Sequence, residues 1–185
     1  FQDVTVGDTT YEEKTVYVLV DEPVAGEKYL IANIDVTGNI IYGNAGNPEK
    51  VPGRVIVRNN TSVTYADVEV KEGTIKTADT TYADAKYIEL DNVGAVWTVG
   101  SGLSFENGSY YLNRSSTNLS LSNSASTSWT YSKYEDRLTT IDDSKTYYVY
   151  HTYHSSTWKL TTSNRANEDS TRDIFFYKEV PAQIF

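Results

Sequence analysis

Aromatic and planar polar side chains gather in one short stretch of this sequence, residues 147–158. The stretch holds four tyrosines, two histidines and one tryptophan. Flat rings can stack on the C–H faces of sugars, and planar polar groups can hydrogen-bond sugar hydroxyl groups. Tyr153 and His154 fall in the turn that follows a predicted strand, so we expect both side chains to be exposed. The chemistry that this stretch indicates is ligand binding.

Trp158 closes the stretch and admits two interpretations. It has the same strand parity as Leu160 and corresponds to Leu119 in an internal repeat, which favours a tryptophan in the core. In the alternative interpretation, Trp158 is a platform for a ligand at the end of a strand. We take Tyr153, His154 and Trp158 as the predicted centre of ligand contact.

Tyr110 and Arg114 form a second, weaker candidate site. They lie in a segment that repeats the pattern of residues 145–150. A guanidinium donates two hydrogen bonds in one plane, which suits vicinal hydroxyl groups or a carboxylated sugar. In the alternative interpretation, Arg114 is a solvated loop arginine.

Groups suited to catalysis or metal binding are sparse. His151 and His154 are three residues apart after a predicted strand, and this spacing points them to opposite faces. Adjacent acids at residues 135–136, 142–143 and 168–169 are more typical of solvated turns than of a hydrolytic pair. The calcium-loop, phosphate-loop and nucleophile-elbow motifs are missing from the sequence. We therefore expect no enzyme activity, no cofactor and no metal.

The composition narrows the class of partner. The chain has 185 residues and a formal net charge of −9, which argues against nucleic acid and against anionic membranes. No stretch is apolar enough to span a bilayer, so we expect no membrane insertion. The chain has no cysteine and is rich in Ser, Thr, Asn and Tyr, which resembles modules of bacterial secreted and cell-surface proteins. We expect an extracellular location.

The elements that must position these residues are short strands. Val, Ile, Thr, Tyr and Trp occur in short runs separated by Ser, Asn, Asp and Gly, which predicts an all-β fold. Helical periodicity is absent, so we expect at most one or two short helical turns, with residues 80–86 as the candidate.

A weak internal sequence repeat groups the predicted strands into three units. Residues 26–31, 108–113 and 145–150 read GEKYLI, GSYYLN and KTYYVY, and each is followed by an apolar patch, a small polar turn and an aromatic strand. With one opening strand, each unit has four strands. Trp97, Trp129 and Phe175 take matched places in the aromatic strands, so we expect them to be equivalent in the core.

Three units of four short strands resemble the β-trefoil of lectins and carbohydrate-binding modules. The resemblance implies a barrel in which no single unit buries its own apolar face, and it implies binding of a glycan or polysaccharide. It rests on the strand pattern over residues 16–180. The Gln-x-Trp triplet of ricin-type trefoils is missing from all three units. The sugar contacts of that family are therefore not carried over to this chain.

The spacing of the units predicts the domain organisation. The interval from Tyr29 to Tyr111 is longer than that from Tyr111 to Tyr148, which indicates a β-rich insertion at residues 48–91 in the first unit. This insertion is either a decorated loop or one wall of a ligand site. Residues 1–15 resemble a lead-in linker and residues 181–185 an exit linker of a module within a larger protein.

The sequence thus predicts a non-catalytic, lectin-like module of a secreted or cell-surface bacterial protein. One alternative is an adhesin domain that binds a host or matrix protein through the same aromatic surface. Another is a structural spacer in a surface stalk.

Overall fold

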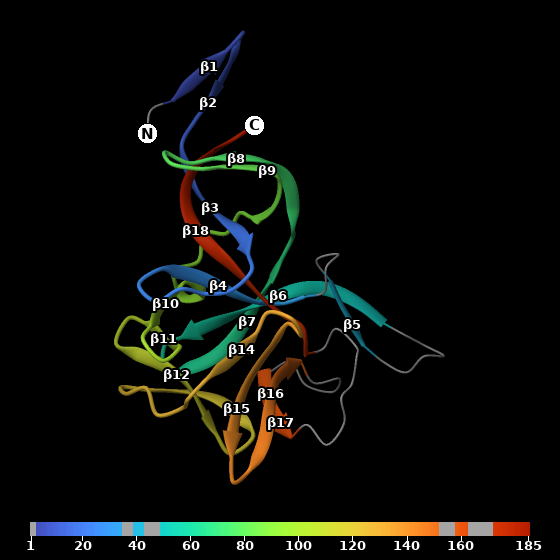
Figure 1. Ribbon diagram of the computed structural model, residues 1–185, viewed down its shortest axis with the longest axis vertical. Coiled ribbons are helices and arrows are strands. Elements are labelled where there is room, and N and C mark those ends of the chain that lie inside the picture. Colours follow the sequence, from blue (N-terminus) through green and yellow to red (C-terminus); the bar gives the residue numbers. More distant parts are fainter. Residues whose placement is uncertain (1–2, 35–38, 43–48, 152–157, 163–171) are drawn as a thin grey trace.

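The protein is an all-β chain, as the sequence predicts. The computed structural model (Figure 1) describes residues 3–34, 39–42, 49–151, 158–162 and 172–185, and one short 3-10 turn, η1 (Val93–Ala95), interrupts the strands of these segments. The strands are β1 (Val4–Val6), β2 (Thr9–Tyr11), β3 (Lys14–Val20), β4 (Lys28–Asn33), β5 (Asn39–Tyr42), β6 (Glu49–Asn59), β7 (Ser62–Val68), β8 (Lys71–Lys76), β9 (Thr81–Ile88), β10 (Trp97–Gly100), β11 (Ser104–Asn107), β12 (Tyr110–Ser115), β13 (Asn118–Ser122), β14 (Thr130–Ser132), β15 (Arg137–Asp142), β16 (Lys145–His151), β17 (Trp158–Thr162) and β18 (Ile174–Ile184).

Sixteen of the described strands are hydrogen-bonded into one antiparallel sheet, and β1 and β2 form a separate hairpin. The order along the sheet is β14-β15-β16-β17-β13-β12-β11-β10-β4-β18-β3-β9-β8, and β6 joins β4 to β5 and β7. The long strand β18 pairs with β4 on one edge, with β3 on the other, and with β8 at its end. β9 pairs with both β3 and β8, so the strands β18, β3, β9 and β8 close a ring. β18 therefore runs from the ring in the upper part of the view to the middle of the molecule (Figure 1).

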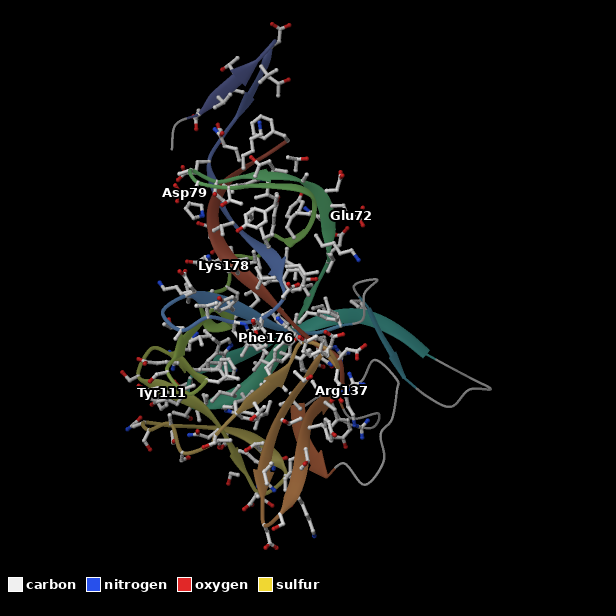
Figure 2. All side chains as sticks on the ribbon, in the orientation of Figure 1. Glu72, Asp79, Tyr111, Arg137, Phe176 and Lys178 are labelled. Atoms are coloured by element: carbon white, nitrogen blue, oxygen red, sulfur yellow. The ribbon has the colours of Figure 1, made fainter. Side chains whose placement is uncertain are left out.

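Three apolar cores fill the spaces between these strands. In Figure 2, Phe176 lies within the body of the molecule, whereas Glu72 and Asp79 lie at its outer surface. Below, the first core is the set of buried residues Tyr29, Ile31, Ile56, Trp97, Val99, Phe105, Leu112, Leu119, Trp129, Leu138, Val149, Ile174 and Phe176. The second core includes Leu30, Val55, Val57 and Tyr177, and the third includes Val16, Ile75, Tyr87 and Val180.

Two tryptophans of the first core make the same kind of hydrogen bond. Trp97 and Trp129 are both buried, and the indole Nε1 of each donates to a backbone carbonyl, that of Ile56 at 2.9 Å and that of Leu112 at 3.0 Å. The prediction that Phe175 joins them is wrong by one residue. Phe176 is buried in the first core, and Phe175 is partly buried against the second, because successive strand residues face opposite sides.

The same alternation corrects the alignment of the repeat. The sequence pattern matched Leu30 with Leu112 and Val149. Leu112 and Val149 lie in the first core, but Leu30 lies in the second, and its neighbours Tyr29 and Ile31 lie in the first. A one-residue slip along a strand moves a side chain to the other face, so the first repeat is offset by one residue from the other two.

The segment predicted as an insertion, residues 48–91, contributes to all three cores. Ile56 lies in the first core, Val55 in the second and Ile75 in the third. The segment folds into strands β6 to β9, and β6 pairs with β4. The helical turn expected at residues 80–86 is wrong, because these residues lie almost entirely in β9, which pairs with β8 and buries Tyr87 and Ile88.

The predicted linkers have strand structure as well. Residues 4–11 form the β1–β2 hairpin, and β3 begins at Lys14. Residues 181–184 continue β18, in which Ala182 and Gln183 are buried and Gln183 pairs with Lys76 of β8. The end of β18 therefore closes the ring described above.

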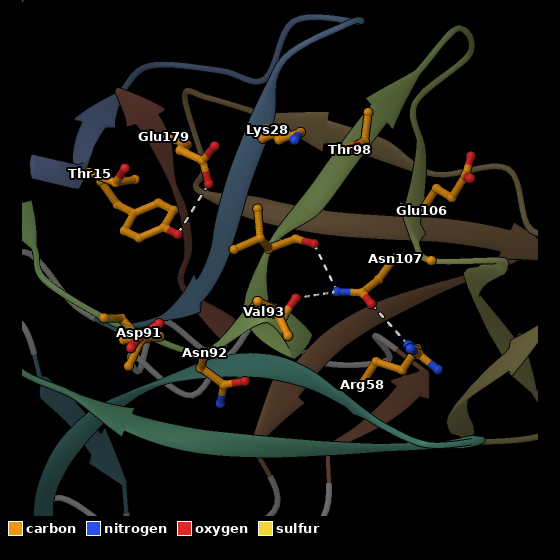
Figure 3. A pocket seen from close by; sticks show the side chains of 14 residues that line it. Thr15, Lys28, Arg58, Asp91, Asn92, Val93, Thr98, Glu106, Asn107 and Glu179 are labelled. Carbon is orange, nitrogen blue, oxygen red and sulfur yellow. Dashed lines mark hydrogen bonds between the residues drawn. The ribbon is translucent and has the colours of Figure 1, made fainter. Parts of the chain in front are cut away.

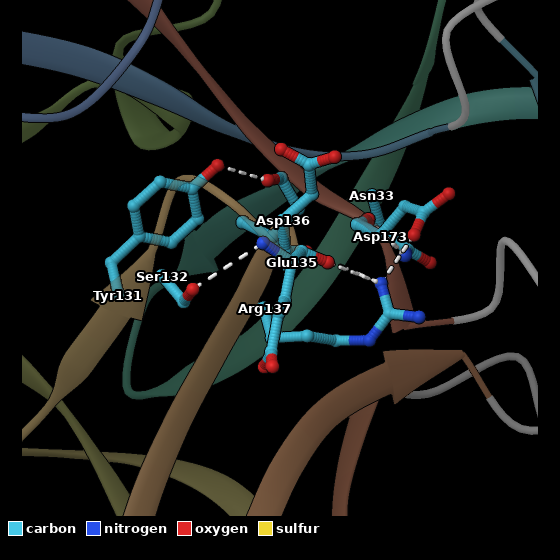
Figure 4. A network of polar contacts seen from close by, with 8 residues as sticks. Asn33, Tyr131, Ser132, Glu135, Asp136, Arg137 and Asp173 are labelled. Carbon is cyan, nitrogen blue, oxygen red and sulfur yellow. Dashed lines mark hydrogen bonds and ion pairs between the residues drawn. The ribbon is translucent and has the colours of Figure 1, made fainter. Parts of the chain in front are cut away.

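A polar network fixes the start of β18 (Figure 4). Arg137 donates to the carboxylate of Asp173 and, at 3.0 Å, to the carbonyl of Glu135. Asn33 donates to the backbone carbonyl of Asp173 at 2.8 Å, and the Tyr131 hydroxyl donates to the carbonyl of Ile174 at 2.6 Å. These contacts join β4, β14 and β15 to the residues that lead into β18.

Among the described residues, no helix is long and apolar enough to cross a membrane.

Candidate functional site

A cleft of about 580 Å³ opens on the outer face of the sheet, away from the first core (Figure 3). Its floor is built by β3, β18, β4, β10 and β11, which are consecutive neighbours in the sheet. Its wall is the connection between β9 and β10, together with Arg58 of β6 and Asn107 at the end of β11. Because strand residues alternate, the floor carries the side chains that do not enter the first core.

One residue from each neighbouring strand forms a row across this floor. Thr98 pairs with Lys28 on one side and with Glu106 on the other. The last residue pair between β4 and β18 is Tyr29 with Lys178, so Lys28 lies level with Glu179. Directly opposed residues share a face of the sheet. The cross-strand row, as we call it below, is Tyr17, Glu179, Lys28, Thr98, Glu106 and Tyr111.

A tyrosine stands beside a glutamate at each end of the cross-strand row. The Tyr17 hydroxyl donates to Glu179 Oε2 at 3.2 Å. Burial, and then the charge of Glu179, raise the pKa of Tyr17 far above its ordinary value, so this phenol remains a donor. At the other end, a hydrogen bond to Glu106 raises the pKa of Tyr111. The bond from Tyr17 orients Glu179, and both carboxylates keep acceptor sites for a ligand.

The wall of the cleft is fixed by two asparagines. Asn92 caps η1, because its side chain accepts from the amide of Gly94 at 3.1 Å. Asn107 is buried and donates to the carbonyls of Val93 and Val96 at 2.8 and 2.9 Å. A Cβ at Gly94 would lie 2.5 Å from the carbonyl oxygen of Arg58, so only glycine lets the wall approach β6 this closely.

Arg58 projects from β6 to the edge of the cleft and is held entirely by uncharged groups. Its Nε donates to Asn107 Oδ1 at 2.9 Å and its Nη1 donates to the carbonyl of Asn60 at 2.7 Å. Its guanidinium carbon lies 5.1 Å from the centre of the Tyr110 ring. Nη2, next to Gly108, makes no hydrogen bond to a described residue, so a donor is left for a ligand.

The cleft presents a mixed set of charges. Lys28 and Arg58 line it, as do Asp91, Glu106 and Glu179. Apolar surface comes from Leu90, Val93 and Val96, and Val93 is 87% exposed. The site therefore offers oriented donors and acceptors beside a small apolar surface.

None of the five predicted binding residues is among the described residues that line the cleft. Tyr153 and His154 fall outside the described residues. Trp158 begins β17, where it pairs with His151, and its side chain is outside the described part of the structure. Ligand contact at these three residues stays a prediction.

The structure places Tyr110 and Arg114 on one strand but not in one patch. They share the strand face that carries the buried Leu112, and four residues separate them by about 13 Å. Tyr110 lies beside Arg58 at the edge of the cleft. Arg114 instead packs against Tyr147 of β16 and pairs with Asp142 of β15 at 2.7 Å.

Lys28, Arg58, Glu106 and Asn107 are cleft residues that the sequence did not single out. The one-residue offset of the first repeat removes the match of Lys28 with Tyr110 and Tyr147, so the repeat contains no signal for Lys28. Arg58 lay within the presumed insertion, and nothing in the sequence placed it beside Tyr110. The cross-strand row depends on strand register, which motif spacing does not reveal.

The described side chains include no group of three or more His, Cys, Asp or Glu placed to hold a metal ion. Comparisons of this chain with protein-family models, curated proteins and solved structures found no match.

Proposed function

We propose that this protein is a non-catalytic carbohydrate-binding domain that takes a saccharide in the cleft. The observation that carries the proposal is the cross-strand row, in which acceptors at Glu179 and Glu106 flank donors at Lys28 and Thr98. Sugar hydroxyl groups need both kinds of partner within short distances. A shallow site of this kind supports affinities from about micromolar to millimolar.

Two further features of the fold support a lectin-like domain of the β-trefoil type. The three-unit sequence repeat includes the matched tryptophans, and the indole of each donates a hydrogen bond to a strand carbonyl. The pairing of β4 with β18 joins the first unit of the repeat to the last strand of the chain, as a three-fold closed arrangement requires. The composition supports a secreted or cell-surface protein of bacterial type.

The spacing of the acids on the floor favours binding over hydrolysis. Three strand spacings separate Glu106 from Glu179, or about 14 Å between Cα atoms. Paired catalytic carboxylates in glycosidases are about 5 to 9.5 Å apart.

A filled cleft tests the proposal. Thr98 lies at the centre of the floor, and Thr98→Tyr places a ring where a sugar would lie. Thr81→Tyr in β9 is the matched control, because Thr81 is an exposed strand threonine that does not line the cleft. We expect the wild-type chain and Thr81→Tyr to bind glycans on an array, and we expect Thr98→Tyr to lose that binding while keeping its melting temperature. Equal binding by all three proteins would place the site elsewhere, and an array without any bound glycan would refute the proposed function.

A second candidate function is protein binding, which one surface favours. Tyr134 is 89% exposed and Val24 is 58% exposed. They lie on two turns that an ion pair joins, Lys133 to Glu22 at 3.6 Å. An exposed tyrosine on an ordered turn is typical of binding hot spots. Tyr134→Ala would abolish binding to a host or matrix protein and leave glycan binding intact if this surface is used.

A further inference from the structure

We infer that the cleft selects an anionic saccharide, one that carries a carboxylate or sulfate group, and that Arg58 and Lys28 bind that group. This inference rests on the proposed function, because it names the class of glycan that the same cleft takes. The observation behind it is that neither Arg58 nor Lys28 makes an ion pair with a described residue.

Arg58 differs in this respect from Arg54, Arg114 and Arg137. Arg54 pairs with Asp67, Arg114 with Asp142 and Arg137 with Asp173. Arg58 has as its polar partners an amide oxygen and a backbone carbonyl, and it makes no ion pair with any described residue. A partly buried guanidinium held by neutral groups is fixed in direction and keeps its full charge. Such a group attracts an anion to its remaining donor, Nη2.

Lys28 places a second cation on the floor of the same cleft. Its side chain is exposed and makes no ion pair with a described residue, although Glu179 stands level with it on the next strand. The Tyr17 hydroxyl donates a hydrogen bond to Glu179, and Tyr111 stands opposite Glu106 on the next strand. The glutamates remain acceptors for hydroxyl groups, whereas Lys28 is left for a negative group of the ligand.

An acidic sugar complements this arrangement better than a neutral one. It carries an anionic group for the two cations and neighbouring hydroxyl groups for the carboxylates. The carboxylates Asp91, Glu106 and Glu179 repel an anion that lacks hydroxyl donors. A simple anion such as inorganic sulfate should therefore bind far more weakly than an acidic saccharide.

The test is calorimetric titration of the full chain with matched ligands. Tetragalacturonate is the carboxylated probe, its fully methyl-esterified form is the neutral counterpart with the same backbone, and an oligosaccharide of κ-carrageenan carries sulfate without carboxylate. We expect one or both acidic ligands to bind at least about ten-fold more tightly than the ester, with an affinity that falls as salt is raised. The two acidic ligands separate the carboxylate from the sulfate.

Variants assign the effect to residues. Arg58→Gln and Lys28→Gln should each weaken binding of the preferred acidic ligand by about 10- to 100-fold, the range for one charged hydrogen bond. Arg54→Gln is the matched control on the same strand, since Arg54 is paired with Asp67 and stacked on Tyr65, and we expect no effect on binding. Lys28 is exposed, so Lys28→Gln keeps the test decisive even if Arg58→Gln fails to fold.

The outcomes separate this inference from the proposed function. Equal affinity for the acidic ligands and the ester, with no loss in Lys28→Gln, would overturn the anionic selectivity while the cleft remained a glycan site. Failure of these ligands, together with an array on which no glycan binds, would overturn the proposed function itself.

Discussion

The guanidinium carbon of Arg114 lies 3.5 Å from the centre of the Tyr147 ring. The same guanidinium pairs with Asp142 through Nη1, and Nε is buried without a hydrogen-bond partner among the described residues. The Arg114 side chain is only 11% exposed. Arg114 thus joins β12 to β15 and β16, and this structural use competes with the ligand-binding role that the sequence suggested.

Truncation of this contact should separate stability from binding. Arg114→Ala should lower the free energy of unfolding by about 1 to 3 kcal/mol, because stacking and a charged hydrogen bond are lost at a mostly buried side chain. Asp142→Ala should cost about 1 kcal/mol or less, since the Asp142 side chain is 64% exposed. Urea denaturation measures both. Arg114 would regain its role as a ligand residue if its alanine variant kept full stability but lost glycan binding.

Trp129 should be among the most costly residues to truncate. It is 4% exposed in the first core and its indole donates to the carbonyl of Leu112. Trp129→Ala should reduce the free energy of unfolding by about 3 to 5 kcal/mol. Trp129→Phe, which retains an aromatic ring but loses the donor, should cost less. A loss below about 1 kcal/mol for the alanine variant would mean that Trp129 is not a core residue.

Gly108 should matter for both stability and binding. Its φ is +63°, and a Cβ there would lie 3.3 Å from Arg58 Nη2. Gly102 is the matched control, with φ +68° and nothing within 4 Å of a Cβ. Alanine at either position should cost about 1 to 2 kcal/mol from left-handed backbone strain. Only Gly108→Ala should also weaken binding of an acidic saccharide. Equal binding by the two variants would mean that Arg58 does not take part in ligand binding.

Stability should decline in alkaline solution because of buried tyrosines. Burial raises the pKa of Tyr177 well above its ordinary value, so the unfolded chain releases this proton at lower pH than the folded chain does. The contribution is full below about pH 10 and is lost as pH rises toward the folded pKa, by about 1.4 kcal/mol per pH unit for one tyrosine. Tyr177→Phe should flatten this decline in urea unfolding between pH 9 and pH 11. Tyr134→Phe, at an 89% exposed position, should leave it unchanged. The reverse pattern would contradict burial as the cause.

The fold class was predictable because strand signals are local. Short β-branched and aromatic runs between turn residues predict strands wherever they pack. The face that each strand buries was less predictable. Leu30 and Ile31 are both apolar neighbours in one strand, and only pairing with β10 and β18 decides that Ile31 enters the first core. The contribution of residues 48–91 to the cores was hard to predict for the same reason, since Ile56 shares the first core with Trp97, which lies far along the chain.

The candidate site was less predictable than the fold. Its floor takes residues from strands that are neighbours in space but distant in sequence, such as Tyr17 and Glu179. The density of aromatic residues in the sequence instead predicted ligand binding at residues 147–158. Arg58 and Asn107 became recognisable once their hydrogen bond joined β6 to β11. Residue types alone do not show that Arg58 makes no ion pair with a described carboxylate.

Chemical-shift mapping of the labelled protein with a bound oligosaccharide tests the central claim most directly. The account predicts that the amide shifts that move with ligand concentration gather at the cleft, at Lys28, Thr98, Glu106 and Gly108. Shifts gathered instead at Tyr153, His154 and Trp158, with the cleft residues unmoved, would contradict it.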